Sequence, residues 1–526
     1  MKLEGTSLLG GRRGARGGKT FTGVNPVNGE ALPVEFHSAS VSDVEVAANA
    51  AAEAFAVYRR WPTARRVALL NRIAELLEAN AAEIIARANL ETALPTGRLQ
   101  GELARTCFQL RFYGDGVASG LALGARIDHG DSKRQPLPKP DLRSMMIPLG
   151  PVAVFGASNF PLAYSVAGGD TASALAAGCP VIVKAHPAHP GTSEIVGLLV
   201  QQAVREMNAP DGLFSLLFDA GHEIGAALVK HPAIQAVGFT GSRQGGRALM
   251  DLAAARPQPI PVFAEMGSVN PVFVLGEALQ TRAEEIAAGL HGSVTLGVGQ
   301  FCTNPGLVFI EAGDGAKKFV AKLEELMKVT PAGTMLTAGL CSAYQRGAKK
   351  FSQIPGVTTV AAASDANSDR AVATLFRTDA ETFLKNQELM EEVFGPSTLV
   401  VECASRAQML NVARGLEGQL TATIHASPAE LLASEELIDI LTTKAGRLIY
   451  NGFPTGVEVA HAMTHGGPYP ATSDGRSTSV GTRAVERFLR PVSFQNWPDA
   501  ALPEALRDAN PLGIVRLVDG KLKGSD

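Results

Sequence analysis

The sequence of 526 residues has few cysteines, few aromatic residues and no strong excess of charge of either sign. Its five cysteines include no CxxC pair, which excludes a zinc ribbon, a thioredoxin-type motif and a disulfide framework. The formal net charge is −3, from 48 basic and 51 acidic residues. Charge therefore gives no reason to expect nucleic acid or an anionic membrane as a partner. The low cysteine content favours a reducing compartment, and we expect a cytoplasmic location.

Long hydrophobic runs are also missing from the sequence. No stretch of about 18 uncharged apolar residues occurs, so no transmembrane helix is expected. The first residues carry charges and glycines but no apolar core, which argues against a secretory signal. Hydrophobic residues make up 46% of the chain and charged residues 19%, a composition typical of globular proteins. At roughly 100–200 residues per domain, the length predicts two to four domains.

Strand-like and helix-like segments alternate from about residue 145 onward. This alternation predicts an α/β fold with a doubly wound, mostly parallel sheet, whose ligands bind where the strands end. A second α/β segment begins near Pro271 and continues to about Asn451. The predicted strands of the first segment are Val152–Phe155, Val181–Val183, Phe214–Phe218, Ile234–Phe239 and Ile260–Phe263.

Three further segments have distinct patterns. The glycine-rich residues 1–18 follow no strand, and we expect them to be flexible. Residues 41–92 are mainly helical, because apolar residues between Leu69 and Leu77 recur on one helical face. The polar residues 131–140 contain three prolines, which predicts a linker or an extended arm.

Two features could hold a phosphate group. Gly241 and Ser242 lie where a strand turns into a helix, so free N–H groups and the positive helix end could meet a pyrophosphate. A plain strand–helix turn explains these residues equally well. Lys184 ends another strand and could reach a ribose or a phosphate, although a surface lysine is the simpler reading.

Three side chains could carry covalent chemistry. Cys302 lies among Gly, Asn and Pro residues, which is typical of an irregular loop, and it could act as a nucleophile. Glu265 ends an apolar strand, and we expect burial to raise its pKa and to suit it to general-base catalysis. The amide of Asn159 could stabilise an oxyanion. Taken singly, these residues could equally be a buried thiol, a salt-bridged acid and a turn asparagine.

Several motifs in a fixed order resemble the aldehyde dehydrogenase superfamily over nearly the whole chain. They are Pro148–Gly150, Asn159–Pro161, Lys184, Phe239–Ser242, Glu265–Gly267, Gly299–Cys302 and Glu391–Pro396. The resemblance implies an aldehyde dehydrogenase-like fold, with two doubly wound α/β domains and a β-arm for oligomerisation. The implied nucleotide-binding domain spans residues 19–129 and 148–266, the catalytic domain 267–464, and the arm 130–147 and 488–500.

The resemblance also implies a mechanism. Cys302 attacks the aldehyde, and the Asn159 amide with the Cys302 backbone N–H holds the oxyanion. Hydride then leaves to a nicotinamide, and Glu265 activates the water that hydrolyses the resulting thioester. One departure is Ser268, which stands where the family usually has a second glycine and which puts the local backbone geometry in question.

The cofactor implied by the resemblance is a nicotinamide dinucleotide. Lys184, Gly241 and Ser242 would hold its adenosine ribose and pyrophosphate, whereas Glu392 and Phe394 would contact the nicotinamide ribose and ring. Pro187 replaces the acid that many NAD-preferring members have, so a 2′-phosphate is not repelled. We therefore expect NADP, with NAD possible, and with His186 or Arg243 as helpers.

The C-terminal segment 465–476 and residues 489–496 resemble the branch that acts on 2-oxoglutarate semialdehyde (2,5-dioxopentanoate). Such a substrate carries a carboxylate, which needs an arginine or several hydrogen-bond donors. The candidate substrate contacts are Phe160, Arg476, Ser477, Thr478 and Ser479, with Arg111 and Arg483 as outside candidates; a loop salt bridge is the alternative for Arg476. The ten histidines do not form a metal motif, and we interpret His461 and His465 as loop residues.

Other functions remain open from the sequence. Within the class, the alternative is a dehydrogenase of long-chain or aromatic aldehydes. A CoA-acylating or phosphorylating enzyme is disfavoured by Glu265, because water activation is unwanted there. A non-catalytic protein that kept the fold would have an inert Cys302 thiol. The family resemblance also implies a homodimer or homotetramer, in which the arm adds strands to a neighbour's sheet.

Overall fold

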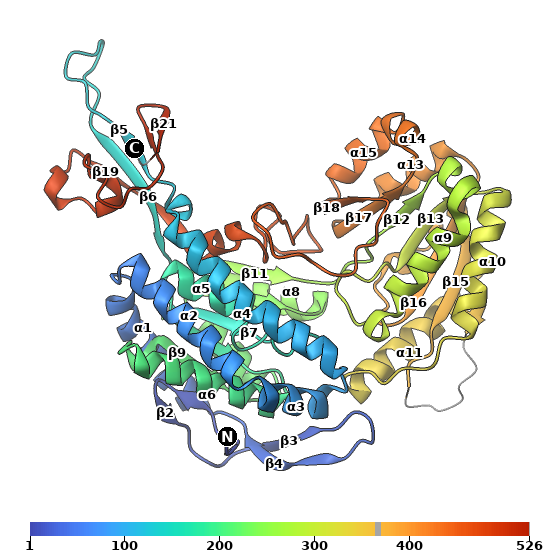
Figure 1. The fold of residues 1–526 in the computed structure, drawn as a ribbon, viewed down its shortest axis with the longest axis horizontal. Coiled ribbons are helices and arrows are strands. Elements are labelled where there is room, and N and C mark those ends of the chain that lie inside the picture. Colours follow the sequence, from blue (N-terminus) through green and yellow to red (C-terminus); the bar gives the residue numbers. More distant parts are fainter. Residues whose placement is uncertain (363–369, 525–526) are drawn as a thin grey trace.

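The computed structural model describes residues 1–362 and 370–524 of the chain. Figure 1 shows two α/β lobes and a protruding arm sheet beside the first lobe. The first lobe contains a seven-stranded sheet in the order β11-β10-β7-β8-β9-β1-β2. Its strands are β1 (Leu8–Leu9), β2 (Arg12–Arg13), β7 (Val152–Phe155), β8 (Val181–Lys184), β9 (Phe214–Leu217), β10 (Ala236–Thr240) and β11 (Val262–Glu265).

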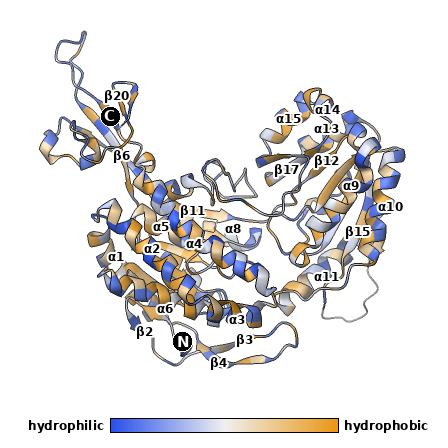
Figure 2. Cartoon of the chain, viewed as in Figure 1, coloured by the Kyte–Doolittle hydropathy of each residue, from blue (hydrophilic) through white to orange (hydrophobic). Residues whose placement is uncertain are grey.

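Helices cover both faces of this sheet because successive strand residues point to opposite sides. In β7, Val152 and Val154 pack under α2–α6, whereas Ala153 packs under α1, α7 and α8. The helices are α1 (Val41–Tyr58), α2 (Thr63–Ala79), α3 (Ala81–Thr92), α4 (Thr96–Ala118), α5 (Gly169–Ala177), α6 (Pro190–Glu206), α7 (Glu223–Lys230) and α8 (Arg243–Ala254). The hydropathy colouring of Figure 2 shows the polar outer faces of several of these helices.

Residues 1–18 are not the flexible segment that the sequence suggested. Leu8 in β1 is fully buried and pairs with Leu216 of β9, and β2 continues the sheet beyond β1. The backbone N–H groups of Glu4 and Gly5 donate to the buried carboxylate of Glu194. The prediction was wrong because glycine content was taken as the signal, whereas two apolar residues and a distant strand determine the structure.

The second lobe contains a sheet in the order β14-β15-β16-β13-β12-β17-β18. Its strands are β12 (Val272–Val274), β13 (Leu307–Glu311), β14 (Thr358–Ala362), β15 (Thr374–Asp379), β16 (Ser397–Cys403), β17 (Gln419–His425) and β18 (Ala445–Tyr450). Its helices are α9 (Gly276–Thr295), α10 (Asp314–Lys328), α11 (Ala338–Ser352), α12 (Ala380–Lys385), α13 (Arg406–Gly415), α14 (Pro428–Leu432) and α15 (Glu435–Thr442). Of the catalytic domain expected at 267–464, residues 363–369 lie outside the described residues.

The two segments expected to form an arm do pair with each other. Strand β6 (Leu142–Pro148) runs antiparallel to β19 (Leu489–Gln495) along its whole length. They belong to a five-stranded arm sheet with β5 (Arg126–Asp128), β20 (Arg516–Val518) and β21 (Lys521–Lys523). A separate hairpin joins β3 (Thr20–Val24) to β4 (Ala31–His37).

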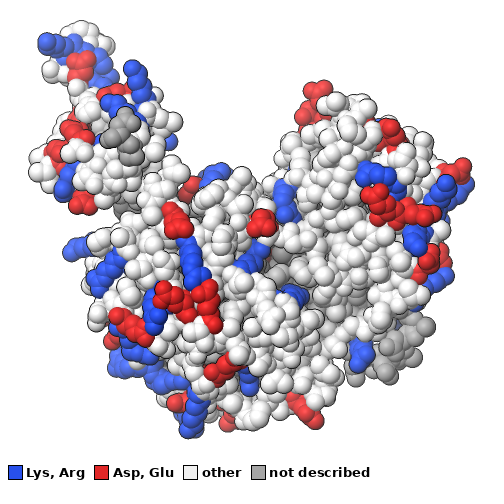
Figure 3. Space-filling view, in the orientation of Figure 1, with Lys and Arg blue, Asp and Glu red and all other residues white. Residues whose placement is uncertain are grey.

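Acidic and basic side chains are interspersed on the face of the molecule shown in Figure 3. Among the described residues, no helix combines the length and the apolar character needed to cross a bilayer.

Candidate active site

The ends of parallel strands and one loop build the site. Glu265 is the last residue of β11, and Asn159 follows β7, the second strand along in the same sheet. Cys302 lies after a 3₁₀ turn at Leu296–Gly299 that joins α9 to the following loop. Because parallel strands end at one edge of the sheet, residues distant in sequence meet there.

The loop that carries the nucleophile is held by close backbone packing. Gly299 has a φ of +66°, and a Cβ at this position would lie 2.3 Å from the carbonyl carbon of Gly395. The amide of Asn270 donates to the carbonyls of Cys302 (2.9 Å) and Asn304 (3.0 Å). The Gly299–Cys302 and Glu391–Pro396 motifs are therefore in direct contact.

Ser268 has a structural role in place of the expected glycine. Its hydroxyl donates to the side chain of Gln419 and accepts from the backbone N–H of Leu420. It thereby ties the segment after Glu265 to β17 of the second lobe. A glycine at this position would lose both of these hydrogen bonds.

Half-buried Cys302 forms a cluster with the buried side chains of Glu265 and His465. The Cys302 Sγ lies 3.6 Å from Nε2 of His465, and the same Nε2 lies 2.8 Å from Oε1 of Glu265. All three ligand atoms lie within 4.8 Å of one another, a spacing that could also hold a metal ion. His465 does lie in a loop, as the sequence indicated, but its side chain is 1% exposed and contacts the nucleophile, a contact that the sequence analysis did not predict.

The electrostatics of the cluster differ from the sequence expectation. Burial, followed by the charge of Glu265, raises the pKa of the Cys302 thiol well above its usual value. Burial acts to raise the pKa of Glu265 as well, but the His465 charge and hydrogen bonds from His465 and Ser479 lower it below its usual value. The expected rise in the Glu265 pKa was wrong because His465 was not recognised as its neighbour.

Asn159 lies next to the nucleophile loop. Its amide nitrogen donates to the carbonyl of Gln300 at 3.1 Å, two residues before Cys302. The ring of Phe160 packs edge-on against Phe301 and Tyr164, so the apolar wall beside Cys302 is aromatic. The amide has a second N–H that this hydrogen bond leaves available.

The residues predicted to hold the adenosine half lie at one edge of the first sheet. Lys184 is 9% exposed, its ammonium donates to the Asp219 carbonyl at 2.6 Å, and burial lowers its pKa to about 8. Ser242 caps α8 and follows Gly241, with both residues exposed at the helix N-terminus. Burial and the neighbouring His189 lower the pKa of His186 well below its usual value, so His186 is neutral.

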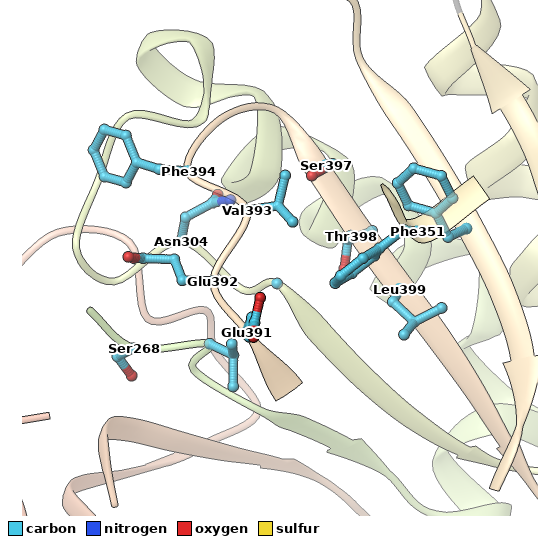
Figure 4. Close-up of a pocket in the computed structure, with 13 residues that line it drawn as sticks. Ser268, Asn304, Phe351, Glu391, Glu392, Val393, Phe394, Ser397, Thr398 and Leu399 are labelled. Atoms are coloured by element: carbon cyan, nitrogen blue, oxygen red, sulfur yellow. The ribbon is translucent and has the colours of Figure 1, made fainter. Parts of the chain in front are cut away.

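Glu392 and Phe394 border a pocket in the second lobe. Figure 4 shows these two side chains on the opposite side of the pocket from Phe351. The lining also includes Ser268 and Asn304, but neither Cys302 nor Glu265. Part of the Glu392 side chain is open to water. Protein atoms packed around its carboxyl group nevertheless desolvate it and raise its pKa to about 7.

The predicted substrate contacts divide into two groups. Ser477, Thr478 and Ser479 line a small pocket with Glu265 and His465, and the Ser479 hydroxyl donates to Glu265 at 2.8 Å. The cationic candidates are instead held by acidic partners at the surface. Arg476 is 90% exposed in its side chain and pairs with Asp474, Arg111 pairs with Glu78, and Arg483 lies near Glu486. Arg243, the proposed cofactor helper, pairs with Glu417.

Two arginines near Cys302 escaped the sequence analysis. Arg98 of α4 donates to the Asn159 carbonyl, its guanidinium lies 4.7 Å from the ring centre of Phe301, and its buried Nη1 has no hydrogen-bond partner. Arg447 of β18 donates to two backbone carbonyls, and its Nε is also buried without a partner. Burial lowers the pKa of Arg447, and the Cys302 charge counteracts this. Neither arginine belongs to a recognisable motif.

A half-buried cysteine beside a buried glutamate indicates the class of protein, an enzyme with a thiol nucleophile and a carboxylate base. The chain belongs to the aldehyde dehydrogenase family, whose model matches residues 13–366, and it is therefore an oxidoreductase. It is similar to alpha-ketoglutaric semialdehyde dehydrogenase 2 of Azospirillum brasilense, with 51% identity over 99% of this chain and 100% of that protein. It is also 45% identical to alpha-ketoglutaric semialdehyde dehydrogenase of Acinetobacter baylyi, over 99% of both chains.

The fold is shared with solved structures as well. Betaine aldehyde dehydrogenase from Staphylococcus aureus, solved in complex with NAD⁺, matches with a TM-score of 0.80 at 19% identity. The match covers 94% of this chain and 98% of that one. The predicted aldehyde dehydrogenase-like fold is therefore confirmed.

Proposed function

We propose that the protein oxidises 2-oxoglutarate semialdehyde, also called alpha-ketoglutaric semialdehyde, to 2-oxoglutarate with a nicotinamide dinucleotide. The observation that carries this proposal is the placement of the Cys302 Sγ within 4.8 Å of the Glu265 carboxylate. The substrate follows from the two relatives of that name, which match this chain over almost its whole length. A nucleophile and a water-activating base in contact are what hydrolytic aldehyde oxidation requires.

Each of these side chains has one task in the proposed reaction. The Cys302 sulfur forms a bond to the aldehyde carbon, and the free N–H of Asn159 stabilises the oxygen that becomes negative. Glu265 later removes a proton from the water that attacks the thioester carbon, and the carbon–sulfur bond then breaks. Its depressed pKa keeps Glu265 ionised, and therefore competent as a base, at neutral pH.

The dinucleotide supplies the hydride acceptor, and the residues present fit such a group. Lys184 offers a buried ammonium, whereas Ser242 and the N-terminus of α8 offer hydrogen-bond donors suited to phosphate oxygens. We propose a preference for NADP because Pro187 leaves no acid next to Lys184 in the chain to repel a 2′-phosphate. Neutral His186 and paired Arg243 contribute little charge, so Lys184 is the main cation of this site.

Cofactor affinity should fall as pH rises through the pKa of Lys184. Burial lowers this pKa from 10.5 to about 8, so the ammonium loses its charge above pH 8. The KM for NADP should then rise up to about tenfold per pH unit. Lys184→Met should have a high KM that no longer depends on pH in this range. Initial rates at pH 7 to 9.5 with NADP and NAD test this, and a constant wild-type KM would contradict it.

We further propose that Arg98 and Arg447 bind the substrate carboxylate, in place of Arg476. Both side chains keep a buried N–H without a partner, and a carboxylate accepts two such hydrogen bonds. Arg98 also lies against Phe301, the residue before the nucleophile. A carboxylate held there would direct the other end of a short oxo-acid toward Cys302.

Substitution of either arginine should therefore impair one substrate and spare another. Arg98→Met and Arg447→Met should each raise the KM for 2-oxoglutarate semialdehyde at least about tenfold, because a charged hydrogen bond is lost. Rates with hexanal, which has no carboxylate, should change little. Arg476→Met is the matched control, since its exposed guanidinium is bound to Asp474. Faster oxidation of hexanal than of the oxo-acid aldehyde by the wild type would favour the long-chain alternative.

We also propose a homodimer or homotetramer formed through the arm sheet. Apolar side chains remain exposed on the arm, including Leu137 (69%) in the loop between β5 and β6, Trp497 (50%) after β19 and Leu522 (77%) in β21. Apolar surface of this kind marks protein interfaces. No disulfide bond forms among the described cysteines, which suits the cytoplasmic location we propose.

A further inference from the structure

We infer that the hydroxyl of Tyr164 recognises the 2-oxo group of the substrate and thereby determines specificity for aldehydes that carry a 2-oxo acid at their other end. This inference rests on the proposed function. It names the contact that separates 2,5-dioxopentanoate from other short aldehydes with a carboxylate. Tyr164 belongs to none of the motifs that the sequence analysis singled out.

The backbone places Tyr164 on the same turn as the oxyanion donor Asn159. The turn follows β7 and contains two hydrogen bonds. The Ala157 N–H donates to the Tyr164 carbonyl at 2.9 Å, and the Tyr164 N–H donates to the Phe160 carbonyl at 3.3 Å. Because both residues belong to one short, hydrogen-bonded turn, Tyr164 is held in a defined position relative to the group that meets the aldehyde oxygen.

Two aromatic neighbours place the Tyr164 ring close to Cys302. Phe160 packs edge-on against it with ring centres 5.3 Å apart, and Phe160 also contacts Phe301, the residue before the nucleophile. The other neighbour is His465, whose ring centre lies 6.4 Å from that of Tyr164 and whose Nε2 contacts the Cys302 sulfur. On each of these two routes, a single ring separates the tyrosine from the nucleophile loop.

The Tyr164 hydroxyl can donate a hydrogen bond to a ligand. Nη2 of Arg105 donates to the hydroxyl oxygen at 3.3 Å, a contact that uses a lone pair and leaves the O–H hydrogen for another acceptor. Arg105 is itself held by the Val457 carbonyl and by the Gln109 side chain, which accepts from its Nε at 2.9 Å. A hydroxyl that accepts from a cation is a stronger donor through its own hydrogen. Burial raises the pKa of Tyr164 well above its usual value, so the hydroxyl keeps that hydrogen.

The hydroxyl is also close to both ends of the space proposed for the substrate. The charges of Glu265 and Cys302 act on it, and it acts in turn on the guanidinium of Arg447. Interactions of this kind weaken with distance. The hydroxyl is therefore near the nucleophile and near one of the two arginines proposed to hold the carboxylate.

The covalent structure of 2,5-dioxopentanoate requires a donor in this region. Its C2 carbonyl is bonded to the carboxylate carbon, and two methylene groups separate it from the aldehyde carbon. With the carboxylate at Arg447 and the aldehyde carbon at Cys302, the C2 oxygen lies between these two groups. A carbonyl oxygen taken from water needs a hydrogen-bond donor in exchange. The aromatic wall of Phe160 and Phe301 supplies none, whereas the Tyr164 hydroxyl does.

The test compares two aldehydes that differ only at C2. The wild type and its variants are assayed with 2,5-dioxopentanoate and with 5-oxopentanoate, which has a methylene group in place of the C2 carbonyl. Tyr164→Phe should lower kcat/KM about three- to tenfold for the first aldehyde, because one hydrogen bond is lost, and should leave the second within about twofold. Tyr58→Phe is the matched control, because it removes a buried hydroxyl that donates to Leu175 in the core of the first lobe.

Competitive inhibition by the two product acids gives a second readout that involves no chemical step. The acid 2-oxoglutarate should inhibit the wild type more strongly than glutarate, and Tyr164→Phe should reduce that difference about three- to tenfold. Absence of a preference for the 2-oxo compounds in the wild type, or its persistence in Tyr164→Phe, would overturn the role of Tyr164. Faster oxidation of hexanal than of either acid aldehyde by the wild type would instead overturn the proposed substrate.

Discussion

Cys302→Ala should lose steady-state turnover by a factor on the order of 10⁴ or more with every aldehyde tested. The sulfur forms the only covalent bond between the protein and the substrate in the proposed mechanism, and the methyl group of alanine cannot form that bond. The site should otherwise persist, because Asn270 holds this loop through the Cys302 carbonyl rather than through its side chain. Formation of reduced nicotinamide over several minutes measures the loss directly.

The control for this variant is Cys403→Ala. Cys403 is fully buried in the core of the second lobe, among the apolar residues that cover one face of the sheet. Its removal should lower stability through the small cavity it leaves but keep kcat within a few-fold. Steady turnover of Cys302→Ala at near wild-type rates would contradict the thioester mechanism outright.

Glu265→Gln should separate the two halves of the reaction. The amide occupies nearly the same volume and can keep contacts with Ser479 and His465, but it cannot remove a proton from water. Thioester formation should therefore give a rapid burst of about one reduced nicotinamide per active site. The steady rate that follows should be about 10²–10⁴-fold below that of the wild type.

Stopped-flow absorbance resolves the burst from the slow phase, and Glu436→Gln serves as the control. Glu436 is exposed and pairs with Arg414 at the surface, so its variant should show wild-type kinetics. A Glu265→Gln variant with no burst and no steady rate would place Glu265 in thioester formation as well.

The sequence predicted the positions that follow from strand ends. Lys184 and Glu265 each terminate a run of buried apolar residues, and a parallel sheet brings such ends to one edge. The predicted strand at residues 260–263 lies at 262–265 in the structure. Local patterns suffice for these elements because each strand is a short run of mostly buried residues.

The residues that the sequence missed depend on contacts distant along the chain. His465 is 163 residues from Cys302 and lies in an irregular segment, so no periodicity marks its approach to the sulfur. Arg476 looked suitable because it is cationic and ends the C-terminal segment 465–476, but its salt bridge with Asp474 holds it at the surface. The role of Ser268 could not be inferred either, because its partner Gln419 is 151 residues away along the chain.

The pairing of Leu8 with Leu216 has a consequence for how the chain is made. The first strand leaves the ribosome about 200 residues before its partner, a delay of roughly 10–40 s at typical rates of synthesis. During that interval the apolar dipeptide Leu8–Leu9 lacks its partner strand β9, and closing so long a loop carries an entropic cost. The first strand can therefore join the sheet only after β9 has been synthesised, although it is the first strand to be made.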